Sequence, residues 1–358
     1  MRSLYRSRLK SVLWAACLAA FLCLSGTAFA QRYSQTNLVS NIPGLAAVTD
    51  SNLVNPWGIA FAPTSPFWIA DNGAGVSTLY RADGTPVPLV VTIPPPGGST
   101  GTAAPTGMIF NGTGDFLVSG NGASGPAVFI FATEDGTISG WNPRVDLTHA
   151  VLTVDNSALG AVYKGLAMAQ TSNGSFLYAT NFHDGTVEMY DTSFQLVKTF
   201  TDTGVPPRYA PFGIRNIKGK LYVTFAEQND AKHDDVAGPG HGFVDVFDTA
   251  GNMLRRLVSG GPLNSPWGIA LAPGHFGKFS RALLIGNFGN GRISGFNLET
   301  GALRGQILDS AGSALSINGL WTITFGNGVS TGPANALFFS AGINDEADGL
   351  FGELRKIP

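Results

Sequence analysis

Side chains able to carry acid–base chemistry gather most densely in one segment, residues 227–242. This segment holds the neighbours His233 and Asp234, and also His241, and a similar His–Asp pair begins at His183. Histidine changes its protonation near neutral pH, so His183, His233, His241 and Asp234 are candidate catalytic residues. The alternative is a solvated polar loop without chemistry, since the spacing matches no zinc motif such as His-Glu-x-x-His.

A second group of candidates carries oxygen-bearing side chains at the ends of equivalent predicted strands. Its members are Asn72, Asn121, Asn181, Glu227 and Asn287. Amide and carboxylate oxygens around one axis are the ligands that Ca²⁺ prefers, so Ca²⁺ is the cofactor hypothesis and no other cofactor is indicated. The alternative is that the asparagines serve tight turns, because asparagine tolerates left-handed backbone angles.

Aromatic residues recur at one point of the sequence pattern and form a third group. Trp57, Trp267 and Trp321, together with Asp71, are candidate ligand-binding residues. The tryptophans are expected either to pack between structural units near an axis or to form a platform on which a sugar stacks. The acidic segment 344–349 is interpreted as an exposed turn, because it lacks the ligand spacing of an EF-hand.

An internal repeat is expected to position all of these side chains. Pro-Trp-Gly-Ile-Ala occurs at 56–60 and again at 266–270, and looser copies follow the same order. The shared position is occupied, at spacings of 48 to 58 residues, by Gly58, Gly107, Gly165, Gly213, Gly268 and Thr322. Second strands are expected at 67–70, 116–119, 176–180, 221–225, 283–286 and 337–341. Four strands in about 50 residues predict an all-β, six-bladed β-propeller with four-stranded antiparallel blades.

The two ends of the repeat region predict how the ring closes. The last copy leaves room for only three strands, the third of them at 350–357, whereas segment 33–40 precedes the first copy and has the pattern of a single strand. We expect this N-terminal strand to close the last blade, which removes an open sheet edge.

Composition supports this fold and excludes some partners. Apolar residues make up 44% of the chain, charged residues only 13%, and there are 47 glycines. Ordinary domains contain about 25% charged residues, so few charges and many glycines favour an all-β protein with many turns. No basic stripe predicts nucleic-acid binding.

The first thirty residues have the pattern of a Sec-type signal peptide. A basic start (Arg2 to Lys10) precedes an apolar run at 12–24 and a small-x-small cleavage pattern that ends at Ala30. Cleavage there would remove Cys17 and Cys23 and leave one domain, residues 31–358. The mature protein is predicted to be a bacterial secreted or periplasmic monomer without a membrane span or a disulfide.

Several strings resemble known propellers. They include Asn-Pro-Trp-Gly at 55–58, Thr-Glu-Asp-Gly-Thr-Ile-Ser-Gly-Trp at 133–141, Val-Tyr-Lys-Gly-Leu at 162–166 and Gly-Asn-Phe-Gly-Asn-Gly at 286–291. The chain is similar to NHL-type propellers and, more narrowly, to an uncharacterised family of secreted bacterial six-bladed propellers. Some members of that family carry a PEP-CTERM sorting tail, which this sequence lacks. The resemblance implies the fold and the compartment but no established activity.

Two functions remain open at this stage. One is the binding of an extracytoplasmic ligand (a polysaccharide, a small molecule or a protein) on the upper face of the propeller. The alternative is a Ca²⁺-dependent, lactonase-like hydrolase or lyase with its site at the axial mouth, because lactonase-type propellers use a similar ring of ligands. Convergence of the five ring residues on one point would favour the enzyme. Side chains turned into their own loops would favour the binding protein.

Overall fold

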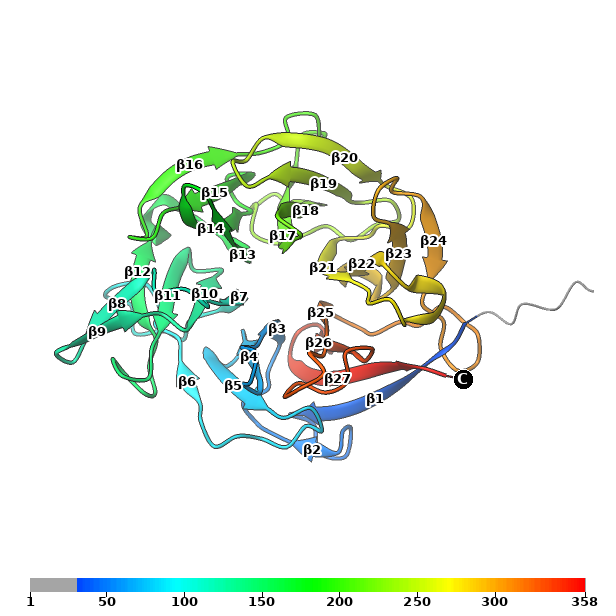
Figure 1. The fold of residues 1–358 in the computed structure, drawn as a ribbon, viewed down its shortest axis with the longest axis horizontal. Coiled ribbons are helices and arrows are strands. Elements are labelled where there is room, and N and C mark those ends of the chain that lie inside the picture. The colour runs from blue at the N-terminus through cyan, green and yellow to red at the C-terminus, as the bar shows by residue number, and fades with distance from the viewer. Residues whose placement is uncertain (1–30, 358) are drawn as a thin grey trace, which may run out of the picture. The chain divides into compact units, whose positions relative to one another are not determined.

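Six antiparallel sheets surround a common axis in the computed structural model, which describes residues 31–357 (Figure 1). The predicted signal peptide, residues 1–30, lies outside the described residues. The prediction of an all-β, six-bladed propeller with four-stranded antiparallel blades is confirmed. The helices in the described chain are three short 3-10 turns, η1 (Ser157–Leu159), η2 (Gly277–Phe279) and η3 (Phe288–Asn290). None of them is long and apolar enough to cross a membrane.

Each blade runs outward from the axis in four strands. The innermost strands are β3 (Pro56–Ala60), β7 (Pro105–Phe110), β13 (Tyr163–Thr171), β17 (Tyr209–Ile217), β21 (Pro266–Leu271) and β25 (Leu320–Phe325). The second strands are β4 (Phe67–Asp71), β10 (Phe129–Thr133), β14 (Gly174–Asn181), β18 (Lys220–Glu227), β22 (Ala282–Asn287) and β26 (Leu337–Ile343). The third strands are β5 (Val76–Tyr80), β11 (Thr137–Trp141), β15 (Thr186–Tyr190), β19 (Phe243–Asp248), β23 (Ile293–Asn297) and β27 (Asp348–Lys356). The outer strands are β6 (Val91–Thr92), β12 (Val151–Asp155), β16 (Leu196–Phe200), β20 (Met253–Ser259), β24 (Leu303–Gln306) and β1 (Tyr33–Ser40).

The repeated glycine is required by the close approach of neighbouring inner strands. A Cβ atom built on Gly58 would lie 2.5 Å from the carbonyl oxygen of Thr106 in the next blade, and one on Gly213 would lie 2.1 Å from that of Trp267. Such contacts are well inside van der Waals distance, so a side chain there would push two blades apart. The repeated glycine, which is the strongest signal in the sequence, therefore reflects close packing of the inner strands at the axis.

Closure of the ring occurs as predicted. Strand β1 pairs antiparallel with β27, from Tyr33 opposite Lys356 to Ser40 opposite Leu350. The sixth blade is thus built from both ends of the chain, and a short strand, β2 (Val48–Thr49), extends it in parallel with β1. Pairing the two ends covers the edge of β27, the third strand of this blade, which would otherwise be open.

The hydrophobic core is divided by the blades rather than gathered in one place. Six clusters of buried side chains each lie between two successive blades, and a seventh lies on the axis. The axial cluster consists mainly of aromatic residues from the starts of the inner strands, among them Trp57, Phe212, Trp267 and Trp321. Each blade therefore adds its own layer of core, as expected for a closed repeat fold.

One predicted strand is wrong. Segment 116–119 was expected to be the second strand of the second blade, but β8 (Leu117–Gly120) pairs only with β9 (Ala123–Pro126) and forms a separate hairpin. The second strand is β10, which pairs with β7 on one side and β11 on the other. The hairpin has the same alternating pattern as a blade strand, so local periodicity alone could not exclude it.

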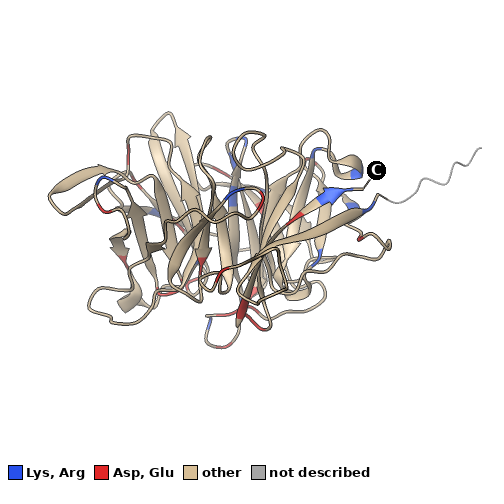
Figure 2. Cartoon of the chain, turned by 90° about the horizontal axis from the view of Figure 1, so that it is seen from below, with Lys and Arg blue, Asp and Glu red and all other residues tan. Residues whose placement is uncertain are grey.

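The loops of the propeller belong to two opposite faces. We call the face where inner strands begin and second strands end the upper face, and the opposite one the lower face. The edge-on view shows Asp and Glu gathered more toward one face and Lys and Arg more toward the other (Figure 2). Residues just before an inner strand and just after a second strand meet at the upper mouth of the axis, where the polar side chains described next are found.

Candidate functional site at the upper axial mouth

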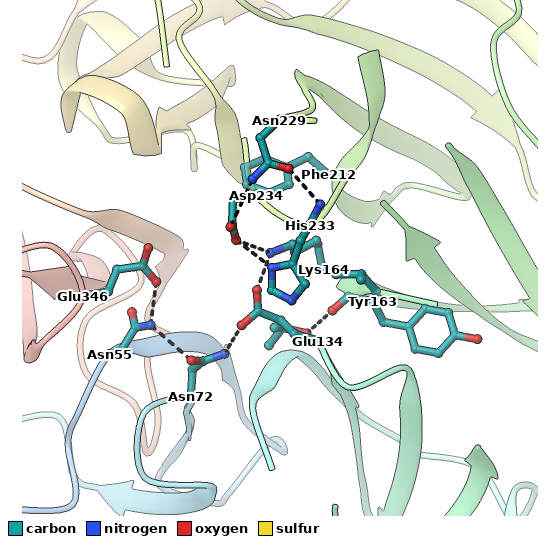
Figure 3. A network of polar contacts seen from close by, with 12 residues as sticks. Asn55, Asn72, Glu134, Tyr163, Lys164, Phe212, Asn229, His233, Asp234 and Glu346 are labelled. Atoms are coloured by element: carbon teal, nitrogen blue, oxygen red, sulfur yellow. Dashed lines mark hydrogen bonds and ion pairs between the residues drawn. The ribbon is translucent and has the colours of Figure 1, made fainter. Parts of the chain in front are cut away.

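Four polar residues from three blades form a hydrogen-bonded chain across the upper mouth (Figure 3). Asn55 Nδ2 donates to Glu346 Oε2 at 2.6 Å and to Asn72 Oδ1 at 3.2 Å. Asn72 Nδ2 in turn donates to Glu134 Oε2 at 2.8 Å. Asn55 and Glu346 both have positive φ angles, of 46° and 66°. Strained backbone of this kind is often retained where it aims a functional side chain.

A buried lysine forms the centre of the site. Lys164 is only 2% exposed, and its ammonium forms an ion pair with Glu134 and lies 3.8 Å from Asp234 Oδ1. Its Nζ also lies 5.0 Å from the centroid of the Trp57 ring and 5.8 Å from that of Phe182. The carboxylates and the ring faces together offset the cost of removing this charge from water.

His233 and Asp234 reach the same point from the loop that follows β18. The Nδ1 atom of His233 lies 2.8 Å from Asp234 Oδ1, and this hydrogen bond raises the pKa of the imidazole and lowers that of the carboxyl. Asn229 supports both residues, because its Oδ1 accepts from the His233 backbone N–H and its Nδ2 donates to Asp234 Oδ2. The pair is thus held in place by its own loop.

Glu134, His233 and Asp234 could together hold a metal ion. Each offers one ligand atom, and these atoms lie within 4.8 Å of one another. One nitrogen and two oxygen donors suit a transition ion such as Zn²⁺ or Mn²⁺ better than Ca²⁺, which prefers oxygen alone. However, the Lys164 ammonium already contacts two of these residues, so it occupies part of the space that an ion would need.

Two further acids make the mouth acidic overall. Burial raises the pKa of Glu346 to about 7, and the negative charge of Glu134 adds to this. Burial also raises the pKa of Asp235, and the side chain of Ser265 opposes this only in part. Perturbed acids of this kind at a mouth indicate a functional site.

Glu346→Gln is expected to remove a pH-dependent loss of stability. The folded protein keeps the Glu346 proton up to about pH 7, whereas the unfolded chain releases it near the ordinary value of 4.5. The contribution of this group to stability is therefore complete below about pH 4.5 and disappears as the pH rises through about 7. Urea unfolding should show the variant matching the parent near pH 5 and exceeding it near pH 8 by on the order of 2 kcal/mol. A difference in the free energy of unfolding between variant and parent that is the same at pH 5 and pH 8 would contradict the raised pKa of Glu346.

An aromatic layer closes the axis beneath the polar residues. Trp57 stacks on Trp321 with ring centroids 3.4 Å apart, and Phe288 stacks on Trp321 at 4.0 Å. Trp321 Nε1 donates to Asn55 Oδ1 at 3.1 Å, which joins this layer to the polar network. Trp57, Trp267 and Trp321 are 1–8% exposed, so they offer no free face for sugar stacking, and the packing interpretation describes them.

The predicted oxygen ring does not assemble. Of its five members only Asn72 joins the central network; Asn121 lies at the turn of the β8–β9 hairpin and donates to Asp146. Asn181 donates to Glu188 at 2.7 Å, and Asn287 is bonded to the backbone of its own blade. Glu227 forms an ion pair with His241. Asn121, Asn181, Glu227 and Asn287 thus bond within their own blades and do not converge on one point.

The remaining predicted residues lie away from the centre. His183 pairs with Asp184 at 3.0 Å, and His241 pairs with Glu227 at the same distance. Asp71 is fully buried inside the first blade, where its Oδ2 accepts hydrogen bonds from the backbone and hydroxyl of Thr78. Of the four predicted catalytic residues, His233 and Asp234 are therefore brought together with the central network.

Sequence reasoning missed Glu134, Lys164 and Glu346 as site residues, whereas Asp235 lies in segment 227–242, which it had singled out. Glu134 was missed because segment 116–119 was taken as the second strand of that blade. The residues that directly follow the real second strand, β10, were therefore assigned to a turn far from the axis. Segment 344–349 was taken as an exposed turn, but Glu346 is partly buried against Asn55. A signal for Lys164 existed, since it occupies the repeat position that is tryptophan or phenylalanine in four other blades.

The fold and the site define a six-bladed propeller with a charged upper mouth, and comparisons with known proteins agree with that class. The structure is similar to a streptogramin B lyase, with a TM-score of 0.51 and 13% identity over 91% of this chain and 98% of that one. It is also similar to a catalytically inactive virginiamycin B lyase from Staphylococcus aureus with quinupristin, with a TM-score of 0.51 and 13% identity over 92% of this chain and 100% of that one. At this identity the likeness extends to the fold alone.

Closer relatives are found by sequence. Uncharacterized protein R648 of Acanthamoeba polyphaga mimivirus is 32% identical over 328 residues, which cover 89% of this chain and 79% of that protein. Uncharacterized protein L690 of the same virus is also 32% identical, over 89% of this chain and 84% of that protein. No family model matches the sequence. The chain belongs to the family that includes these two viral proteins.

Proposed function

We propose that the protein is a secreted binding propeller whose upper mouth holds a cationic group, an ammonium or a guanidinium, of an extracytoplasmic ligand. The surplus of acids carries this proposal: Glu134 and Asp234 contact the ammonium of Lys164, and its charge also acts on the carboxyls of Asp235 and Glu346. The signal-peptide pattern of residues 1–30 and the resemblance to secreted bacterial propellers support the compartment.

The raised pKa values of Asp235 and Glu346 explain how such a site would work. Without a ligand, burial and the negative charge of Glu134 raise the pKa of Glu346 to about 7, and burial raises that of Asp235 above its ordinary value. A bound cation would stabilise their ionised forms, so binding would release protons. Affinity for a ligand that stays cationic over this range, such as spermidine, should therefore increase as the pH rises from about 6 to about 8.

Matched probes can test this proposal by calorimetry. The glucosamine trisaccharide carries ammonium groups, its N-acetylated counterpart has the same backbone without charge, and spermidine carries the charge without the sugar. We expect the amine-bearing probes to bind and the acetylated sugar not to bind. Asp235→Asn should weaken binding roughly tenfold, because a charge-assisted hydrogen bond is lost.

Glu299→Gln provides the matched control, because Glu299 is 78% exposed on the outside of the fifth blade. This variant removes the same charge and should leave binding unchanged. Equal binding of the acetylated and free sugars, or an equal effect of the two substitutions, would overturn the proposal.

A second candidate function is a metal-dependent hydrolase or lyase, favoured by the grouping of Glu134, His233 and Asp234. Elemental analysis of the purified protein separates it from the first candidate. A stoichiometric transition metal, with a melting midpoint that falls in chelator, would support the enzyme. Absence of metal together with amine binding would support the binding protein.

A further inference from the structure

A separate cavity of about 360 Å³ lies on the axis, lined by residues of the inner strands of all six blades. The aromatic layer of Trp57, Trp267 and Trp321 forms its upper boundary, since Trp267 lines the cavity and also packs in the axial cluster. Phe61, Phe110 and Met168, further along the inner strands, are only partly buried, so the cavity opens toward the lower face. It is thus distinct from the upper mouth.

The side chains that line this cavity are mostly apolar, and Arg215 is the only charged one among them. Arg215 extends from β17 across the channel to the fifth and sixth blades. Its Nη1 donates to the carbonyl oxygens of Ile269 at 2.9 Å and Ile323 at 3.3 Å, and its Nη2 donates to Thr324 Oγ1 at 3.2 Å. These contacts fix the guanidinium in the channel.

No acidic residue balances this charge. Arg215 forms no ion pair with any residue of the described chain, and the cavity lining contains no Asp or Glu. A guanidinium has five N–H donors, so three bonds to neutral oxygens leave two donors without a protein partner. Burial alone lowers the pKa of Arg215, which means that nothing charged nearby offsets its desolvation. An uncompensated cation beside an open cavity is unfavourable unless an anion enters.

We propose that this lower axial cavity binds a small organic monocarboxylate, with the carboxylate on Arg215 and the body of the ligand against the apolar walls. One fixed guanidinium balances one negative charge and matches the geometry of a carboxylate. A multiply charged phosphate would bring more charge than the lining can neutralise. The cavity volume is within the range of small-molecule sites.

Calorimetry with benzoate and hexanoate tests the proposal directly, with benzyl alcohol and hexanol as uncharged probes of matched shape and inorganic phosphate as a compact anion. The carboxylates should bind at least roughly tenfold more tightly than the alcohols and than phosphate. Arg215→Met should reduce carboxylate affinity roughly ten- to hundredfold, and Arg215→Lys should reduce it less, because charge is kept and only the forked geometry is lost.

Two further variants keep the test decisive if Arg215→Met fails to fold. Met168→Trp narrows the rim of the cavity without touching the arginine and should abolish carboxylate binding. Arg81→Met removes the same charge from an exposed residue outside the cavity and should leave binding unchanged. Failure of both carboxylates to bind the parent protein, or equal binding by the Met168→Trp variant, would overturn the proposal. The upper-mouth substitutions do not enter this test, so the two proposals can fail independently.

Discussion

Lys164→Met is expected to lower the free energy of unfolding by about 3–5 kcal/mol. The substitution removes the ammonium that pairs with Glu134 and approaches Asp234, and it leaves the Glu134 carboxylate with only 13% of its side chain exposed. A buried charge that loses its partner costs much more than the net worth of the pair. The contact with the Trp57 ring is lost as well. Urea unfolding near neutral pH measures the change.

A double variant separates the charge effect from loss of packing. Adding Glu134→Gln to Lys164→Met removes the unpaired carboxylate while keeping its shape, so much of the lost stability should return. Lys220→Met, at the exposed start of β18, is the control and should change stability by less than about 0.5 kcal/mol. A Lys164→Met variant as stable as this control would mean that the central ion pair does not hold the upper mouth together.

Tyr33→Ala is expected to destabilise the propeller by about 3–5 kcal/mol, by weakening the attachment of the closing strand. Tyr33 is fully buried, and its ring centroid lies 4.9 Å from that of Phe276 in the neighbouring fifth blade. Its hydroxyl donates to the Phe276 carbonyl oxygen at 3.0 Å. The substitution therefore leaves a large cavity at the junction where the N-terminal strand completes the last blade.

Ser34→Ala gives the matched control for this prediction. Ser34 is the next residue of β1 but is exposed, and its backbone pairing with Arg355 does not depend on its side chain. Thermal melts should show a large decrease for Tyr33→Ala and almost none for Ser34→Ala. Similar small decreases for both variants would indicate that closure depends on backbone pairing alone.

The aromatic layer gives the propeller two chemically different ends. Above it, acids outnumber the single cation of Lys164, whereas below it Arg215 has no acid to balance it. The rings of Trp57, Trp267 and Trp321 separate these charges with a low-dielectric layer, which limits screening by water between them. A cationic ligand at the upper mouth would neutralise the surplus of acids there, and an anionic ligand in the lower cavity would neutralise the charge of Arg215.

Much of the fold was predictable because its determinants are local and periodic. Five of the six copies have a glycine where neighbouring inner strands approach closely, and the number of copies gives the number of blades. The closing strand at 33–40 was predicted with the bounds that the structure has. The sixth copy lacked an outer strand, and this segment before the first copy was the one that could supply it. The exception was the second blade, where the β8–β9 hairpin has the periodicity of a strand but pairs only with itself.

The candidate site was predicted only in part. His233 and Asp234 were found because they are adjacent in sequence and lie in a loop dense in titratable groups. The asparagines were misread as a ring because sequence position indicates the end of a strand but not whether a side chain turns to the axis or into its own loop.

The sequence pattern alone was sufficient for the number of blades, the strand order of five of them and the closure of the ring, because short periods and close glycine contacts encode them. The folded ring is what places Lys164 between Glu134 and Asp234, and Arg215 in the channel without an ion-pair partner among residues 31–357. Residues far apart in the chain meet at these points, and the energy of a buried charge depends on which neighbours the folded ring brings to it.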